Sequence, residues 1–399
     1  DDNSINRPLK IPGRRFVLTE RRILESQKHT KSNRAAAEWL GVSYNTYKKW
    51  AKYYGVFDQH LNQKGDGIKK SLAGAAFSAE SIGLSLSKPD DFNAFWKEKL
   101  ASMTSIPLNP VLTPTESPVS EIELSEVSLD NIWDTKVRGQ IAVKKDLGEQ
   151  KLPAMLVVQW AGIYPLQKTW ATNHAKSGFL CLNILAHDLP IYEAKEFYKD
   201  QNKNALKDYT GIGNDSRETS YFLRMYLGCY QAVQYLKSRP EWDGKTLVVQ
   251  GNSQGGMQGL VTASICNEDV TAVMVNVPAG SDLNGPVADR APGWPGWYYK
   301  TKGRDPDAVR QAARYFDVAN FTDRIECPAL VGIGLADTTC PAAGIFAAIN
   351  QIKQPVQVAT MPGTGHGATK LNDHGLYYKA FGAWKSMIVN GKLSPEPWK

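Results

Sequence analysis

The fold is decided by one stretch of the 399-residue sequence, in which Thr246-Leu247-Val248-Val249-Gln250 runs into Gly251-Asn252-Ser253-Gln254-Gly255-Gly256. The first segment predicts a short apolar strand, and an apolar helix is predicted to follow the glycines. A serine between two glycines at a strand-to-helix turn forms a nucleophile elbow, which lifts the hydroxyl clear of the sheet. Side chains at positions 251 and 255 would collide with their neighbours. The stretch therefore predicts Ser253 as a nucleophile.

The sequence around this elbow alternates between short apolar segments and helical patterns. Strands are predicted at 154–159, 179–185, 246–250, 270–277, 329–335 and 356–361. Helices are predicted at 90–102, 218–238, 254–265, 305–315, 341–352 and 375–389. Strands this uniformly apolar are typical of a parallel sheet that helices cover on both faces. We therefore expect an α/β-hydrolase fold with a mostly parallel, doubly wound sheet.

Two earlier segments, 121–129 and 136–145, alternate apolar and polar residues. This alternation predicts an antiparallel pair at an edge of the sheet. The segment 107–118 is rich in proline and is predicted to be irregular.

A serine hydroxyl is a weak nucleophile at neutral pH, so it needs a base, and the base needs an orienting carboxylate. In this fold the order along the chain is serine, acid, histidine, with the last two on loops after strands. Two histidines follow Ser253 in the chain, His366 and His374. His366 is the predicted base because its glycine-rich loop follows the strand at 356–361. His374 begins the last helix and is expected at the surface or as a helix cap.

The predicted acid is Asp337, which directly follows the strand at 329–335. Asp282, Asp317 and Asp323 are alternatives, but none of them follows a strong apolar strand. A turn, or the cap of the following helix, is the structural alternative for Asp337 itself.

Acyl transfer also needs backbone N–H groups aimed at the developing oxyanion. One is predicted to be the N–H of Gln254, the residue after the nucleophile. The second is predicted in the loop at 159–164, where we assign it to the N–H of Ile163, and Gly162 would allow close approach of the backbone.

The sequence gives no signal for a metal or a cofactor, and none is predicted. The five cysteines are widely spaced, no CxxC pair is present, and no HExxH motif occurs. They are expected to be buried thiols, including Cys340, which lies near Asp337 but is predicted to pack as a small apolar residue. No apolar run reaches the roughly 18 residues of a membrane span, so no membrane partner is predicted.

Three other features each have two interpretations. The aromatic cluster at 292–299 either lines a sugar-binding pocket or forms a packed lid. His174 and His187 are either site residues or structural histidines, and the structural interpretation is favoured.

Positive charge is concentrated at the start of the chain. Residues 1–74 carry 15 of the 47 Lys and Arg residues but 7 of the 40 Asp and Glu residues, a net charge of +8. The remaining residues are close to balance. This asymmetry predicts two modules with different partners, at 1–72 and 77–399.

Residues 77–395 resemble the acetyl xylan esterases of carbohydrate esterase family seven. The resemblance rests on the elbow, on Gly334-Leu335-Ala336-Asp337 leading to Cys340-Pro341, on His366, and on Phe92-Asn93-Ala94-Phe95-Trp96. It implies a serine carboxylesterase that removes acetyl groups from acetylated xylose units and xylo-oligosaccharides through an acyl-enzyme. The nucleophile, base and orienting acid would then be Ser253, His366 and Asp337.

The chain departs from the family pattern at two places. The family's Arg-Gly-Gln motif after the strand at 179–185 is replaced by Ala186-His187-Asp188-Leu189-Pro190, and Arg138-Gly139-Gln140 lies too early to be that motif. Gly367 stands where Glu usually follows the catalytic histidine. The substrate and the oligomeric state are therefore left open, a homo-oligomer included.

The module at 1–72 resembles helix-turn-helix DNA-binding domains of a kind seen in phage proteins. Alanines stand where two helices would cross, Gly41-Val42-Ser43 predicts the turn, and Ser32 or Asn33 and then Ser43 are predicted helix caps. The resemblance implies weak binding of duplex DNA through Tyr44, Asn45, Lys48, Lys49 and Lys52. The alternative is a basic helical appendage with no role in DNA binding.

Two classes of function remain open at this point. In the first, the protein is an esterase that acts on small acetylated carbohydrates. In the second, it is a DNA-binding regulator whose hydrolase-fold domain senses a ligand. A sensor need not keep an intact elbow and triad, and this sequence keeps both, which favours the esterase.

Overall fold

The structure is a computed structural model that describes residues 18–30, 32–57, 60, 73–367 and 373–394. It divides into two compact units, Asp1–Ser71 and Leu72–Lys399, and each is described by itself. Both ends of the predicted module 1–72 lie outside the described residues.

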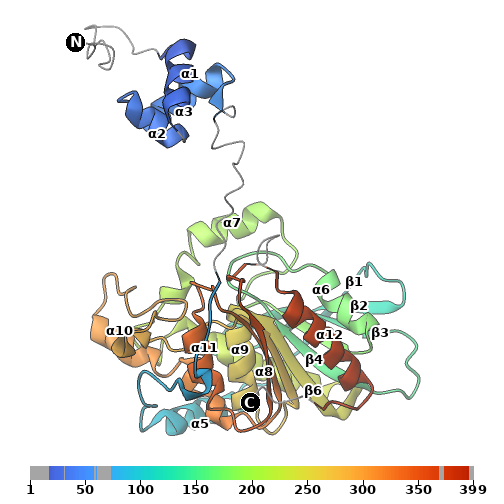
Figure 1. Cartoon of the computed structure of the whole chain (residues 1–399). Helices are drawn as coiled ribbons and strands as arrows, with labels where there is room; N and C mark the ends of the chain where they lie inside the picture. Colours follow the sequence, from blue (N-terminus) through green and yellow to red (C-terminus); the bar gives the residue numbers. More distant parts are fainter. Residues whose placement is uncertain (1–17, 31, 58–59, 61–72, 368–372, 395–399) are drawn as a thin grey trace, which may run out of the picture. The chain divides into compact units, whose positions relative to one another are not determined.

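The larger unit is built around a mixed sheet, whose nine strands within the described residues have the order β1-β2-β3-β5-β4-β6-β7-β8-β9 (Figure 1). The strands are β1 Val111–Thr115, β2 Ile122–Asp130, β3 Lys136–Lys144, β4 Leu152–Val158, β5 Leu180–Ile184, β6 Trp242–Asn252, β7 Ala272–Asn276, β8 Ala329–Gly334 and β9 Val356–Met361. The β1–β2, β2–β3 and β3–β5 pairs are antiparallel. All neighbouring pairs along the rest of the sheet, β5-β4-β6-β7-β8-β9, are parallel. The predicted α/β fold with a mostly parallel sheet is confirmed.

Helices cover both faces of this sheet because successive residues of each strand point to opposite sides. In β4, Leu156 belongs to a core that includes residues of α8 and α9, whereas Val157 belongs to a second core with residues of α6 and α12. The helices are α5 Phe92–Met103, α6 Thr169–Lys176, α7 Lys195–Lys203, α8 Tyr221–Ser238, α9 Gln254–Ile265, α10 Pro306–Ala313, α11 Ala342–Ile349 and α12 Gly375–Val389. The doubly wound arrangement follows directly from the apolar strands.

Three parts of this unit differ from the sequence-based expectation. The segment 107–118 is not irregular, because it contains β1, which pairs with β2 and forms the edge of the sheet. An edge strand tolerates Pro114, since one side of the strand needs no N–H donors. The predicted pair β2 and β3 therefore lies one strand inside the edge. Helices α6 and α7 were not predicted.

Within its described residues, the smaller unit contains the short helices α1 Glu20–His29, α2 Asn33–Trp39 and α3 Tyr44–Tyr53. The side chain of Ser32 caps α2 by accepting a hydrogen bond from the Ala35 N–H, and the side chain of Ser43 caps α3 through the Thr46 N–H. Gly41, between these helices, has a φ of 66°, which favours glycine. The helices enclose a small core of their own, formed by Leu18, Ile23, Ala36, Ala37, Leu40, Tyr47, Ala51, Val56 and Phe57.

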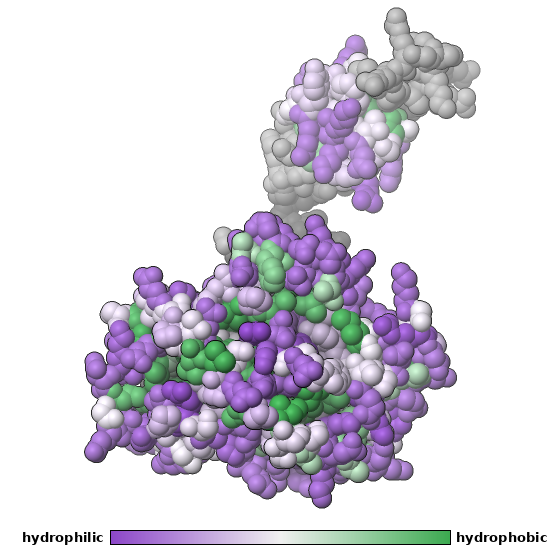
Figure 2. Space-filling model, turned by 180° about the vertical axis from the view of Figure 1, so that it is seen from behind, coloured by the Kyte–Doolittle hydropathy of each residue, from purple (hydrophilic) through white to green (hydrophobic). Residues whose placement is uncertain are grey.

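On the face seen in Figure 2, hydrophobic side chains form separate patches among hydrophilic ones. Within the described part of the chain, no helix is both long and apolar enough to cross a membrane.

Candidate active site

Ser253 occupies the sharp turn between β6 and α9. Its φ of 56° and ψ of −119° lie in a region that residues with side chains rarely adopt. The flanking glycines make this turn sterically accessible: a Cβ at Gly251 would lie 2.4 Å from the Gly255 carbonyl oxygen, and one at Gly255 would lie 2.4 Å from the Val158 carbonyl oxygen. The predicted reason for both glycines is confirmed.

His366 lies between Ser253 and Asp337, although the three residues follow three different strands. Its Nε2 atom is 2.8 Å from the Ser253 Oγ atom, and its Nδ1 atom is 2.7 Å from an oxygen of Asp337. A carboxylate only accepts hydrogen bonds, so it favours the tautomer with hydrogen on Nδ1. Nε2 is then free to accept the serine proton. The structure thus brings together the three residues that were predicted as a triad.

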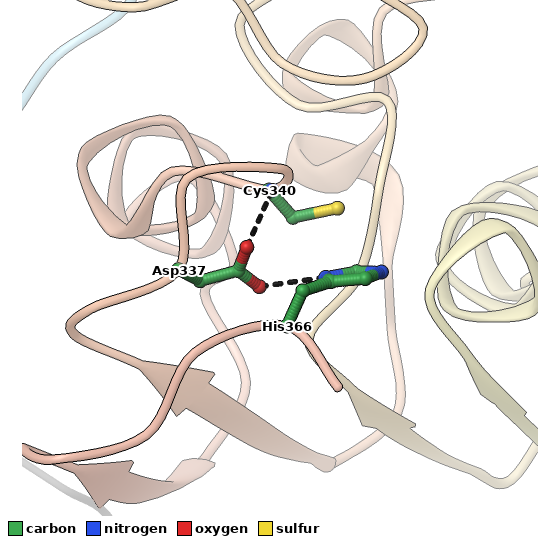
Figure 3. A group of neighbouring side chains, drawn as sticks. All are labelled: Asp337, Cys340 and His366. Carbon is green, nitrogen blue, oxygen red and sulfur yellow. Dashed lines mark hydrogen bonds and ion pairs between the residues drawn. The ribbon is translucent and has the colours of Figure 1, made fainter. Parts of the chain in front are cut away.

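The carboxylate of Asp337 is held rigidly by backbone donors. Its side chain is fully buried, and its second oxygen accepts hydrogen bonds from the N–H groups of Thr339 at 2.8 Å and Cys340 at 2.9 Å. Figure 3 shows this carboxylate turned toward both Cys340 and His366. The turn alternative for Asp337 is therefore part of the same arrangement, because the turn orients the carboxylate toward the imidazole.

The other acidic candidates lie in different interactions. Asp317 accepts hydrogen bonds from the backbone of Asp282 and Leu283, while Asp282 forms an ion pair with Arg290. Asp323 pairs with a lysine, Lys88. The contacts of Asp317 and Asp282 join loops, the contact of Asp323 is an ion pair nearer the surface, and none of them involves His366.

The expectation for His374 is wrong, because this side chain is 4% exposed and makes no capping hydrogen bond. Its Nδ1 atom lies 2.8 Å from Asn276 Nδ2, and its Nε2 atom lies 3.3 Å from the carbonyl oxygen of Gly365. It is buried because the start of α12 packs where the strands end. His374 thus braces the loop that carries His366.

An open cavity of about 660 Å³ lies at the carboxyl ends of the parallel strands, next to Ser253 and His366. Its lining residues are Trp160, Ala161, Asn252, Ser253, Asn276, Val277, Trp294, Thr339, His366, Gly367, His374 and Tyr378. Ligands of open α/β sheets bind at this end of the strands. A larger hollow of about 840 Å³ lies on the smaller unit, but its lining of α1 side chains and His60 offers no nucleophile paired with a base.

The two predicted oxyanion donors lie in different surroundings. Gln254 is the first residue of α9, and the first N–H groups of a helix have no partner within the helix. Ile163 packs against hydrophobic clusters and is not among the residues that line the cavity. Ala161, two residues earlier in the same loop, does line it.

The aromatic cluster at 292–299 divides between its two interpretations. Trp294 lines the cavity, whereas Trp297 is 1% exposed and packs against the ring of Phe222. Three further residues that line the cavity were not predicted as site residues: Trp160, Asn276 and Tyr378. Trp160 and Asn276 could have been predicted, because they stand at the carboxyl ends of predicted parallel strands, and these ends lie on the same side of the sheet.

Cys340 is the third member of a close group with Asp337 and His366, whose potential ligand atoms all lie within 4.8 Å of one another. Burial raises the pKa of the Cys340 thiol well above its usual range, so the sulfur stays protonated. A metal at this group would need a thiolate from Cys340 and free lone pairs on Asp337 and His366. Asp337 and Nδ1 of His366 are instead hydrogen-bonded to each other. The group therefore fits a triad better than a metal site.

The sequence model of the acetyl xylan esterase (AXE1) family matches residues 84–379. The chain belongs to the acetyl xylan esterase family. It is therefore a carboxylic ester hydrolase, and the resemblance stated for residues 77–395 is confirmed. The chain is also similar to acetyl esterase Axe7A of Xylanibacter ruminicola, with 31% identity over 321 residues that cover 79% of this chain and 71% of that one.

Two solved acetyl xylan esterases share its fold. The enzyme from Paenibacillus sp. R4 matches with a TM-score of 0.64 at 22% identity, over 77% of this chain and 98% of that chain. The enzyme from Thermoanaerobacterium sp. JW/SL YS485 matches with a TM-score of 0.61 at 20% identity, over 79% of this chain and 98% of that chain.

Both departures from the pattern of the acetyl xylan esterase family lie beside the site. Gly367, in place of the usual Glu, lines the cavity. His187, within the segment that replaces the Arg-Gly-Gln motif, is 2% exposed and bonds to the loop that follows β4. Neither His174 nor His187 is among the residues that line this cavity.

Proposed function

We propose that Ser253 is the nucleophile, His366 the general base and Asp337 its orienting acid in the hydrolysis of acetyl esters. The chain of hydrogen bonds from Asp337 through His366 to the Ser253 hydroxyl, at 2.7 and 2.8 Å, carries this proposal. Ser253 Oγ attacks the acetyl carbonyl carbon while its proton passes to Nε2 of His366. The resulting imidazolium is stabilised by the buried Asp337 carboxylate.

The second half of the cycle uses the same groups. The tetrahedral intermediate collapses when His366 returns the proton to the departing sugar oxygen, which leaves an acetyl-enzyme on Ser253. Water then attacks this ester, with His366 as base, and acetate is released. Two backbone N–H groups stabilise the oxyanion in each half, and we assign them to Gln254 and, because it lines the cavity, to Ala161 in place of Ile163.

The substrate class proposed is acetylated xylose units and short xylo-oligosaccharides. The cavity combines aromatic faces from Trp160, Trp294 and Tyr378 with polar side chains from Asn252 and Asn276. Aromatic faces pack on the apolar faces of sugar rings, while amides bond to their hydroxyl groups. Release of acetate from acetylated xylo-oligosaccharides, measured against the rate for 4-nitrophenyl acetate, tests the class. A rate for the sugars no higher than spontaneous hydrolysis would contradict it.

For the smaller unit we propose weak, sequence-independent binding of duplex DNA. Asn45, Lys48, Lys49 and Lys52 are exposed and share one face of α3, as their spacing of three and four residues requires. Tyr44 is half-buried, with the guanidinium of Arg34 5.5 Å from the centre of its ring, so its contribution would be smaller. The regulator alternative remains less favoured, since a ligand sensor has no need for the hydrogen-bonded triad.

A further inference from the structure

Three buried rings lie together beside the proposed oxyanion site: those of His187, Tyr209 and Tyr221. His187 is 2% exposed and meets the ring of Tyr209 edge to face, with ring centres 4.7 Å apart. The Tyr221 hydroxyl lies 2.7 Å from His187 Nδ1. Neither His187 nor the two tyrosines belongs to the triad, so their burial calls for another explanation.

The direction of each hydrogen bond in this group is fixed by chemistry. Arg224 carries only donors, and it donates to the Tyr221 hydroxyl oxygen. The carbonyl oxygen of Gly162 only accepts, so Nε2 of the neutral His187 ring must donate to it, and Nδ1 accepts the proton of the Tyr221 hydroxyl. The proton of the neutral ring then lies on Nε2, 3.1 Å from the carbonyl oxygen of Gly162. Arg224 is itself anchored to the Ala186 carbonyl at 2.9 Å.

The hydrogen bonds that run from Arg224 through Tyr221 and His187 to the Gly162 carbonyl keep this direction at neutral pH. Burial, and then the charge of Arg224, lower the pKa of His187 to about 3. The imidazole is thus neutral at pH 7, and its Nε2–H donates to the Gly162 carbonyl.

Gly162 is the position in the loop after β4 where the backbone most needs such a restraint. Its φ of 124° is one that other residues rarely adopt, and glycine has more conformational freedom than any other residue. Ala161, the proposed second oxyanion donor, directly precedes it and lines the cavity. A restrained Gly162 limits the movement of the loop that carries the Ala161 N–H.

The same group also touches the residue that carries the other donor. The Tyr209 hydroxyl donates a hydrogen bond to the side-chain oxygen of Gln254, and the Tyr209 ring packs on His187. We propose that His187 is a positioning residue that fixes the oxyanion-binding loop through the Gly162 carbonyl, with Tyr221 and Arg224 setting its tautomer. This inference rests on the proposed function, because it assigns a role in the same acyl transfer.

The test uses the full chain with His187→Leu, His187→Gln and His187→Asn, assayed with 4-nitrophenyl acetate. The amide nitrogen of Gln reaches the position of Nε2, whereas that of Asn reaches only the position of Nδ1. His174→Leu is the matched control, since it removes another histidine outside the cavity, one whose pKa is likewise lowered to about 3. Active chains are counted by complete labelling with a fluorophosphonate, so that misfolded protein does not lower the rate per active site.

A positioning role predicts a kcat about 10- to 100-fold lower in His187→Leu and His187→Asn, the size expected when an oxyanion donor is misplaced. KM should change less than about two-fold, His187→Gln should recover most of kcat, and His174→Leu should match the parent. Equal kcat per active site in His187→Gln and His187→Asn would overturn the inference, as would a kcat of His187→Leu within about two-fold of the parent. Full activity of Ser253→Ala would instead overturn the proposed function, so the two failures are distinguishable.

Discussion

The hydroxyl of Ser253 and the Nε2 atom of His366 lie 2.8 Å apart, although 113 residues separate them in the chain. Parallel strands make this possible, because β6 and β9 end at the same edge of the sheet and each leads directly into the loop that carries one of the two residues. The geometry is that of a serine whose proton can pass directly to a base.

Acyl-chain length should strongly affect the rate. If the cavity beside Ser253 accepts acetyl groups, each added methylene that does not fit costs on the order of 1–3 kcal/mol of transition-state binding. Comparison of kcat/KM for 4-nitrophenyl acetate, butyrate and octanoate measures this, and the acetate ester should be the best substrate. Faster hydrolysis of the octanoate would show a cavity suited to lipids.

Trp160 should contribute to sugar binding more than to chemistry. It is 38% exposed at the cavity, and its ring stacks on that of Tyr164 with centres 5.3 Å apart. Trp160→Ala should raise KM for acetylated xylo-oligosaccharides about ten-fold, the loss of roughly 1.4 kcal/mol, and change KM for 4-nitrophenyl acetate much less. Trp133→Ala, which removes an exposed tryptophan outside the cavity lining, is the control. Parallel loss on both substrates would argue against a sugar-stacking role.

The stability of the larger unit should fall in mild acid, partly because of His187. Its pKa is about 3 when folded and near 6.5 when unfolded, so the unfolded chain binds more protons between these values. The stabilisation is therefore present above pH 6.5 and is lost as the pH falls toward 3. Between pH 7 and pH 5 the parent should lose about 2 kcal/mol more of its free energy of unfolding than His187→Gln. Thermal unfolding at both pH values measures this, and an unchanged difference between the two proteins would contradict it.

The lysine face of α3 should account for DNA binding by the full chain. Contacts between lysine and phosphate release counterions, so a handful of them predicts that affinity falls by about 10²-fold from 50 to 200 mM salt. Joint replacement of Lys48, Lys49 and Lys52 by Ala should remove most of the affinity and leave esterase turnover unchanged. The matched control removes three exposed lysines of α7, Lys195, Lys199 and Lys203, and should bind as the parent does. Equal loss in both variants would indicate attraction by net charge alone.

Much of the site could be predicted because each residue of the triad lies in a short segment with a recognisable local pattern. The elbow needs glycines at 251 and 255 for steric reasons, and Asp337 and His366 each follow a recognisable strand. The surroundings could not be predicted in the same way. His374 is buried because α12 begins where β7 ends, a contact between distant segments that no local pattern records. The edge strand β1 was missed because its proline and its exposed residues weaken the apolar signal.

The second oxyanion donor shows the same limit at a finer scale, because Ile163 is predicted from the sequence and Ala161 is proposed from the cavity lining. Sequence alone locates the oxyanion loop after β4, but the choice among its N–H groups depends on which one faces the cavity. That choice depends on the backbone conformation of Gly162, with its φ of 124°, and on the buried partner His187. Neither is apparent from the loop sequence itself.

The turnover of Ser253→Ala on 4-nitrophenyl acetate, with folding checked by circular dichroism, shows whether Ser253 is the nucleophile. Loss of a triad serine typically lowers kcat by about 10⁴-fold or more, while the oxyanion donors leave a small residual rate. Ser253→Ala should therefore fold and show a loss of this size. A folded Ser253→Ala protein that hydrolyses the ester within about ten-fold of the parent rate would contradict the assignment of Ser253 as the nucleophile.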